Sequence, residues 1–182
     1  MSVFRFRVLI DTEEDVFRDI DMLEDHSFED FHYAIQESYE FDKLQMASFY
    51  MSNDNWDNGE EVALMDMSED FGPEKLRTMT DTRLKDLVGE VGDKLVYVYD
   101  FMLMWCFFVE LIAVREAEEG EEFPILVNEY GKAPEQYDKE SPLLSEAEMA
   151  KVMNGQDEGD DDEDLDDEIS DMFSDNEYTD ED

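Results

Sequence analysis

The chain has 182 residues, with 54 Asp and Glu against 13 Lys and Arg, which gives a formal net charge of −41 at pH 7. A field of this sign repels nucleic acids and anionic lipids and attracts basic surfaces. The composition therefore argues against direct nucleic-acid binding and predicts a basic protein partner. A halophilic source would also favour an acidic surface.

The N-terminal residues and the cysteine content bear on location. The opening residues alternate charged and apolar side chains and lack the apolar core of an export signal. Cys106 is the single cysteine, which excludes an internal disulfide and a multi-cysteine zinc site. We therefore expect a cytoplasmic protein, and its oligomeric state is left open.

Local patterns near the N-terminus predict two strands and a helix. Alternating apolar and polar residues indicate a half-buried strand over residues 3–10, and a second short strand is expected over residues 16–22. Ser27 then begins a helix that reaches Tyr39. Asp30 follows Ser27 in a variant of the capping box, and apolar residues recur after it at helical spacing.

The next part of the chain predicts a hairpin and a short helix. Residues 44–51 and 62–67 have the composition of strands. The pair Asn58-Gly59 between them tolerates the positive φ that a tight reversal requires. A short helix is then expected to begin at Thr80 or Asp81, because either side chain can cap it.

The most apolar stretch, residues 95–114, has the length of a membrane span. Asp100 lies inside it and Glu110 near its end, and a charged side chain at the bilayer centre costs about 3 kcal/mol. The apolar residues on both sides of residues 102–104 suit two buried strands joined by a turn, so we expect no membrane association. Asp100 is expected to accept backbone N–H bonds from that turn; a functional carboxylate in a pocket beside Trp105 is the alternative.

These elements predict an α+β domain over residues 1–155, with a mainly antiparallel sheet of about five or more strands and helices packed on one face. Ser145 and Glu148 form a further capping box that begins the last helix of this domain. Residues 156–182 are expected to form a disordered acidic tail, since residues 157–182 contain 16 Asp and Glu and no Lys or Arg. The predicted core consists of Phe4, Phe6, Val8, Phe31, Ile35, Val96, Val98, Trp105 and Val109.

No pattern of catalytic, metal or cofactor chemistry stands out. The loop that begins at Asp54 resembles a calcium loop only in part, because Trp56 and Met65 occupy positions that require a ligand oxygen. Neither histidine has zinc-binding spacing, and Cys106 within an apolar run is expected to be an inert core residue. We therefore predict that the protein is not an enzyme and has no catalytic residue, metal or cofactor.

The acidic tail contains one apolar pattern. A stripe at helical spacing is formed by Leu165, Ile169, Met172 and Phe173. One interpretation is a segment that folds onto a partner with a basic-rimmed groove. The other is a solvated charge run without a specific role.

A Gly-Asp pair, an aromatic-rich strand, Asp-Phe, a turn and a Trp follow one another in the second half of the chain. The residues of this unit are Gly92, Asp93, Tyr97, Tyr99, Asp100, Phe101 and Trp105. The unit and the order of the elements resemble the Ri-plasmid orf-three-like family, also labelled as passenger (TnpR-like) proteins of an insertion sequence, over residues 2–138. The resemblance implies the fold and leaves the function open. Where the family has a His after this unit, Phe107 stands here.

The leading hypothesis is a non-catalytic interaction module whose acidic surface engages a basic protein, in competition with nucleic acid. The alternatives are an enzyme with a carboxylate-lined pocket and an accessory protein of a mobile genetic element. A pocket that holds Asp100 beside Trp105 and a second buried carboxylate would favour the enzyme.

Overall fold

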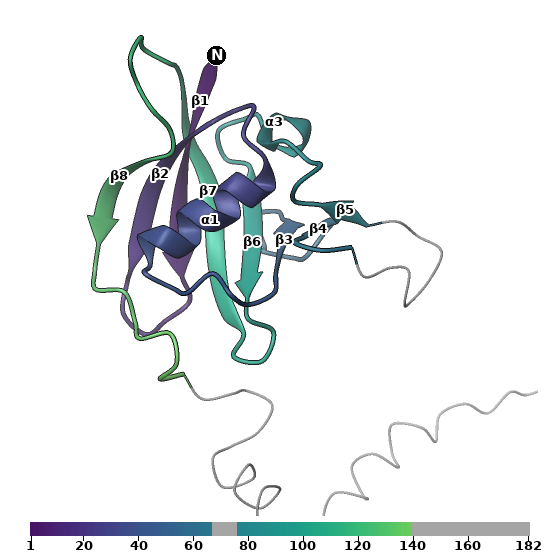
Figure 1. Cartoon of the computed structure of the whole chain (residues 1–182), viewed down its shortest axis with the longest axis vertical. Helices are drawn as coiled ribbons and strands as arrows, with labels where there is room; N and C mark the ends of the chain where they lie inside the picture. The colour runs from purple at the N-terminus through teal and green to yellow at the C-terminus, as the bar shows by residue number, and fades with distance from the viewer. Residues whose placement is uncertain (67–75, 140–182) are drawn as a thin grey trace, which may run out of the picture. The chain divides into compact units, whose positions relative to one another are not determined.

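The computed structural model describes residues 1–66 and 76–139. The strands are β1 (Ser2–Ile10), β2 (Phe17–Leu23), β3 (Ala47–Met51), β4 (Glu61–Ala63), β5 (Arg77–Thr78), β6 (Lys94–Tyr99), β7 (Trp105–Glu116) and β8 (Ile125–Tyr130), and the described helices are α1 (Phe28–Ser38) and α3 (Leu84–Leu87). The strands form one sheet in the order β5-β4-β3-β6-β7-β1-β2-β8 (Figure 1). All neighbours pair antiparallel except β4 and β5. The predicted mainly antiparallel sheet is thus confirmed, in a fold that is mostly sheet; that the helices share one face stays a prediction.

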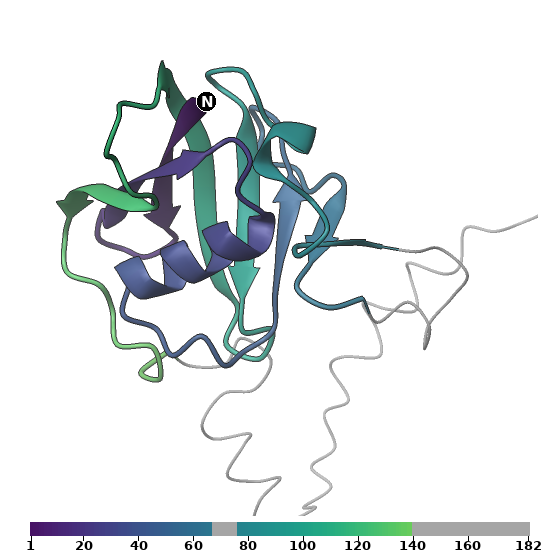
Figure 2. The same cartoon turned by 45° about the horizontal axis from the view of Figure 1, so that its top comes forward.

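Helix α1 begins where the capping box predicts. Oγ of Ser27 accepts a hydrogen bond from the N–H of Asp30 at 3.0 Å, and the Asp30 carboxylate accepts one from the N–H of Ser27 at 3.1 Å. In Figure 2 the helix crosses in front of the sheet. The ring of Phe31 lies 4.5 Å from that of Phe6 on β1 and 5.4 Å from that of Phe49 on β3. Burial of these rings holds the helix against the strands.

The apolar stretch forms β6 and β7, two antiparallel strands joined by a turn at residues 101–104, as predicted. Both strands lie in the interior of the sheet, where each has a neighbour on both sides. Strands buried in this way read as nearly continuous apolar runs. Among the described residues, no helix is long and apolar enough to cross a membrane.

All nine predicted core residues are buried, and seven of them belong to the main cluster. Phe4, Phe6, Val8, Phe31, Ile35, Trp105 and Val109 lie in the main hydrophobic core. On β6 this core takes Tyr97 and Tyr99, whereas Val96 and Val98 are buried on the other face of the sheet. Part of that face is covered by Trp56 from the β3–β4 loop. Its ring packs on Phe108, which lies opposite Val96. Alternation along β6 identifies its two faces and does not tell which one α1 covers.

The hairpin of β3 and β4 is shorter than predicted, and its loop has a different conformation. Strand β3 starts at Ala47 instead of residue 44. The positive φ expected at Asn58-Gly59 occurs at Trp56, where φ is 60°. Gly59 serves close approach instead: its N–H donates to the carbonyl of Met51 at 2.6 Å, and a Cβ would lie 2.7 Å from that oxygen. Glycine is therefore needed here for space between backbones.

The sequence patterns missed both edge strands, β5 and β8. β5 has only two residues, and β8 is exposed along most of its length. An edge strand with one neighbour has no strong alternation to detect. Helix α3 also begins later than expected, at Leu84, after a turn in which the N–H of Arg83 donates to Asp86 at 2.9 Å.

Several predictions fall outside the described residues. They are the helix that begins at Ser145, the domain boundary between residues 155 and 156, the disordered acidic tail, and the stripe of Leu165, Ile169, Met172 and Phe173.

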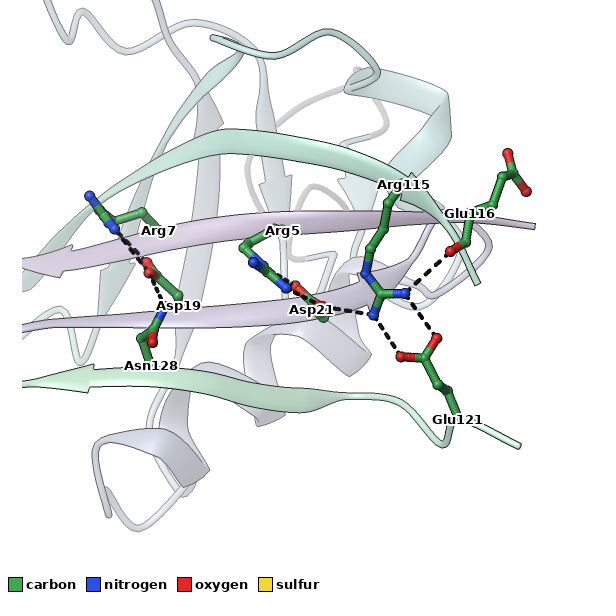
Figure 3. A network of polar contacts seen from close by, with 8 residues as sticks. All are labelled: Arg5, Arg7, Asp19, Asp21, Arg115, Glu116, Glu121 and Asn128. Atoms are coloured by element: carbon green, nitrogen blue, oxygen red, sulfur yellow. Dashed lines mark hydrogen bonds and ion pairs between the residues drawn. The ribbon is translucent and has the colours of Figure 1, made fainter. Parts of the chain in front are cut away.

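A ladder of charged residues lies on the face of the sheet away from α1 (Figure 3). Arg5 donates to both oxygens of Asp21 at 2.7 and 3.0 Å, and Arg115 of β7 donates to the same carboxylate at 3.0 Å. Beside this group, Arg7 donates to both oxygens of Asp19 at 2.9 Å. Both carboxylates are only 1% exposed. In this ladder, arginines of β1 and β7 neutralise the two carboxylates of β2. These ion pairs stabilise the register of the three strands.

Candidate functional site at the end of helix α1

The two candidate residues from the sequence, Asp100 and Trp105, flank the turn between β6 and β7. Oδ1 of Asp100 accepts hydrogen bonds from the N–H groups of Met102 and Leu103 at 3.0 and 3.2 Å. Its φ is 60°, in the left-handed region that Asp tolerates better than most residues. Asp100 is buried, and this turn engages its carboxylate. The geometry is that of a structural acceptor.

Trp105 ties a later part of the chain to the core. Its Nε1–H donates to the carbonyl of Gln136 at 3.1 Å, and its ring packs 5.2 Å from that of Phe41. Gln136 lies beyond the end of β8, so this bond holds the segment of residues 131–138 against the sheet. Trp105 therefore fixes the position of residues 131–138.

Asp42 is the centre of a hydrogen-bond network beside the same segment. The Gln136 side chain accepts from the N–H of Asp42 at 2.7 Å and donates to its Oδ1 at 3.1 Å. The hydroxyl of Tyr99 donates to Oδ1 at 2.7 Å, and that of Tyr137 donates to Oδ2. Burial would raise the pKa of the Asp42 carboxyl, but these hydrogen bonds outweigh it and hold the pKa well below its usual range. Asp42 therefore stays negatively charged.

A cavity of about 730 Å³ lies next to Asp42, and we call it the α1–β8 cavity. The end of α1, strand β8 and residues 131–138 contribute to its wall. Its ionisable side chains, apart from the tyrosines, are the carboxylates of Glu37, Glu40, Asp42, Glu129, Glu135 and Asp138 and the cations Arg18 and Lys132. Carboxylates thus outnumber cations, and neither Asp100 nor Trp105 lines this cavity.

The guanidinium of Arg18 is buried and engaged within the fold. Its Nε donates to the carbonyl of Ser38 at 3.1 Å, at the end of α1. Its Nη1 lies 2.9, 3.0 and 3.1 Å from the carbonyls of Phe17, Tyr130 and Gly131. Arg18 thus joins α1, β2 and the end of β8. An anionic ligand would have to compete with these four carbonyls for it, so the cavity favours cationic groups.

A second polar group lies in the core beneath α1. Nε2 of Gln36 donates to the Tyr97 hydroxyl at 2.9 Å, and that hydroxyl lies 2.5 Å from Nδ1 of His32. The Tyr97 hydroxyl therefore accepts from Gln36 and is shared with the imidazole of His32. Among the described residues, Nε2 of His32 and Oε1 of Gln36 have no hydrogen-bond partner. Burial, with a smaller effect of Lys43, lowers the pKa of His32 to about 4.

The other residues that the sequence offers for metal binding or catalysis do not line the α1–β8 cavity. Asp54 pairs with Lys94 at 3.0 Å, and Nδ1 of His26 accepts from the N–H of Leu23 at 3.3 Å. Cys106 is half-buried, and burial raises the pKa of its thiol. Within residues 1–66 and 76–139, no three His, Cys, Asp or Glu side chains are grouped to hold a metal ion.

Sequence reasoning missed the residues that build the α1–β8 cavity. Asp42 and Gln136 meet across 94 positions of the chain, and each stands in a stretch without a regular pattern. Arg18 is buried on the α1 side of β2, where its Nε donates to the carbonyl of Ser38. The available signal was a charged residue on a strand whose neighbours Val16 and Ile20 are core residues.

The sequence profile of plasmid pRiA4b ORF-3-like proteins matches residues 2–180 of the chain. The chain belongs to this family. The resemblance inferred from the strand–turn–Trp unit is thereby confirmed, and the match extends beyond the part on which it was based. No curated protein has a significant match to the chain.

A crystal structure of a protein of unknown function from Methanosarcina mazei Go1 is similar to this pRiA4b ORF-3-like protein. The two share 22% sequence identity with a TM-score of 0.65, and the alignment covers 96% of this chain and 90% of the other. At this identity the likeness shows a common fold.

Proposed function

We propose that this pRiA4b ORF-3-like protein is a non-catalytic, cytoplasmic interaction module whose acidic surface engages a basic protein. The net charge of −41 attracts such a partner at a distance and raises the rate of encounter. A charge alone gives little specificity, so a defined contact site is also required.

The α1–β8 cavity is the observation that carries the proposal. Six carboxylates and two cations stand on its wall, and one of the cations, Arg18, is engaged by backbone carbonyls. Asp42 is held ionised by four donors, namely two hydroxyls, a side-chain amide and the N–H of Leu44. A Lys or Arg side chain of the partner would find charge-assisted acceptors there, already positioned by the fold.

A comparison of two charge-neutralised variants tests the proposal. Glu129→Gln with Glu135→Gln removes exposed carboxylates from the cavity wall, and Glu118→Gln with Glu119→Gln removes the same charge from the exposed loop between β7 and β8. We expect the full-length protein to bind a synthetic Lys- and Arg-rich peptide in calorimetry at low salt, and added salt to weaken this binding. The cavity variant should bind about fivefold more weakly and the loop variant nearly as well as the wild type.

Two outcomes would contradict the proposal. If the peptide does not bind at low salt, the proposal that the partner is a basic protein is wrong. Equal weakening in both variants would show that the net charge attracts the peptide without a contribution from the cavity.

A further inference from the structure

Within residues 1–66 and 76–139, strand β8 is an edge of the sheet and has β2 as its single strand neighbour. Along such a strand every second residue directs its N–H and C=O away from the sheet. Two large apolar side chains of β8 are also exposed, Leu126 at 41% and Tyr130 at 56%. Natural edge strands are usually protected by charge, proline or a covering segment, so an apolar exposed edge indicates an interaction surface.

A smaller cavity, of about 220 Å³, lies beside β8 and next to the α1–β8 cavity. It is lined by Ile20, Ala34, Glu37, Ser38, Pro124 and Leu126, so most of its wall is apolar. Three of these residues, Glu37, Ser38 and Leu126, also line the α1–β8 cavity. The two cavities therefore adjoin and make one groove along α1 and β8, acidic in one part and apolar in the other.

We propose that β8 receives an extended segment of the basic partner as an added strand. An apolar side chain of that segment enters the smaller cavity at Leu126, and a Lys or Arg side chain on the same face enters the α1–β8 cavity. This inference rests on the proposed function, because it takes the partner to be basic, and it adds the mode of binding. Strand addition combines main-chain hydrogen bonds for affinity with pockets for alternate side chains for specificity.

Charge decides between a basic partner and a second copy of this chain at the β8 edge. Two copies that pair through β8 would bring a net charge of −41 against another of −41 and place the acidic walls of their cavities side by side. A basic segment meets the same wall with attraction. Burial of an apolar side chain between basic ones also adds to the affinity for this groove, whereas a purely electrostatic surface would gain nothing from it.

Two peptides tested against the unaltered full-length protein separate strand addition from simple charge attraction. The first is a short synthetic peptide in which Lys, Leu, Lys and Lys alternate with Thr, so that Leu and Lys share one face of a strand. The second has the same sequence with alternate backbone nitrogens methylated, which removes its donors for strand pairing. We expect the methylated peptide to bind about tenfold more weakly in calorimetry. The first peptide should also slow hydrogen exchange of the β8 amides.

A matched pair of variants tests the apolar cavity. Leu126→Ser removes the apolar wall without a change of charge, and Val91→Ser makes the same change at a residue that is 63% exposed and lines neither cavity. Affinity for the first peptide should fall about tenfold for L126S and stay unchanged for V91S. If both peptides bind equally and L126S has no effect, strand addition at β8 is wrong while the proposed function stands. If neither peptide binds at low salt, the proposed function fails as well.

Discussion

Asp100 stabilises the β6–β7 turn through one oxygen atom and through its tolerance of a left-handed backbone. Asp100→Ala removes both hydrogen bonds and places a less tolerant residue at φ 60°, so we expect it to lower the free energy of unfolding by about 2 kcal/mol. Asp100→Asn keeps an acceptor oxygen and a side chain suited to this conformation and should stay close to the wild type. Urea unfolding of both variants measures the difference. Wild-type stability of the Ala variant would show that the carboxylate has another role.

His32 makes the stability of the fold depend on pH. Its pKa of about 4 lies below the ordinary value of 6.5, so in that interval the unfolded chain takes up a proton that the folded one does not. The stabilisation is therefore complete above pH 6.5 and is lost as the pH falls toward 4, by up to about 3 kcal/mol.

The variant His32→Gln isolates this effect from the titration of the many carboxylates. Wild type and variant share those carboxylates, so the difference between their unfolding free energies reports His32. We expect the wild type to lose more stability than H32Q between pH 7 and pH 5, as measured by urea unfolding at each pH. Parallel pH profiles would mean that His32 titrates normally and is not confined to its neutral form.

At the scale of the elements, the charged ladder holds β1, β2 and β7 together. Asp21 is 1% exposed and accepts from two arginines, so Asp21→Ala leaves both without their buried partner. Because these arginines are partly exposed and can regain water, we expect a loss of about 2 kcal/mol in unfolding free energy, below the range for fully buried pairs. Glu116→Ala removes an exposed carboxylate that pairs with the N-terminal amine and should change stability little. If both substitutions lower the unfolding free energy equally, the buried ion pairs of Asp21 contribute no more to stability than an exposed one.

Elements with strong local patterns were predictable from the sequence. The capping box of Ser27 and the alternation along β1 are determined within a few residues, and β6 and β7 are continuous apolar runs on both sides of a turn. Strand β8 lacks such a pattern because, in the part of the chain that the structure describes, it forms an edge of the sheet and most of its side chains are exposed. Its position depends on pairing with β2, which lies more than a hundred residues earlier in the chain.

At the scale of the whole molecule, the candidate site depends on contacts that no local pattern encodes. Asp42 meets Gln136, Trp105 meets the same residue, and Arg18 meets the end of β8. Each contact joins segments that are distant in sequence and ordinary in composition. The net charge, on which the prediction of a basic partner rests, is read directly from the sequence. The cavity that we propose for this partner exists only in the assembled sheet.

The position of β1 inside the sheet has a consequence for how the protein is made. β1 leaves the ribosome before the other strands of this sheet, and its neighbour β7 pairs with it as far as Ser2 opposite Glu116. At a synthesis rate of about 5–20 residues per second, β1 waits roughly five to twenty seconds for that neighbour. Until then the nascent β1–β2 hairpin has an open strand edge on the side of β1 that later pairs with β7. Until β7 follows, the nascent chain thus offers the kind of strand edge that chaperones hold and proteases cut.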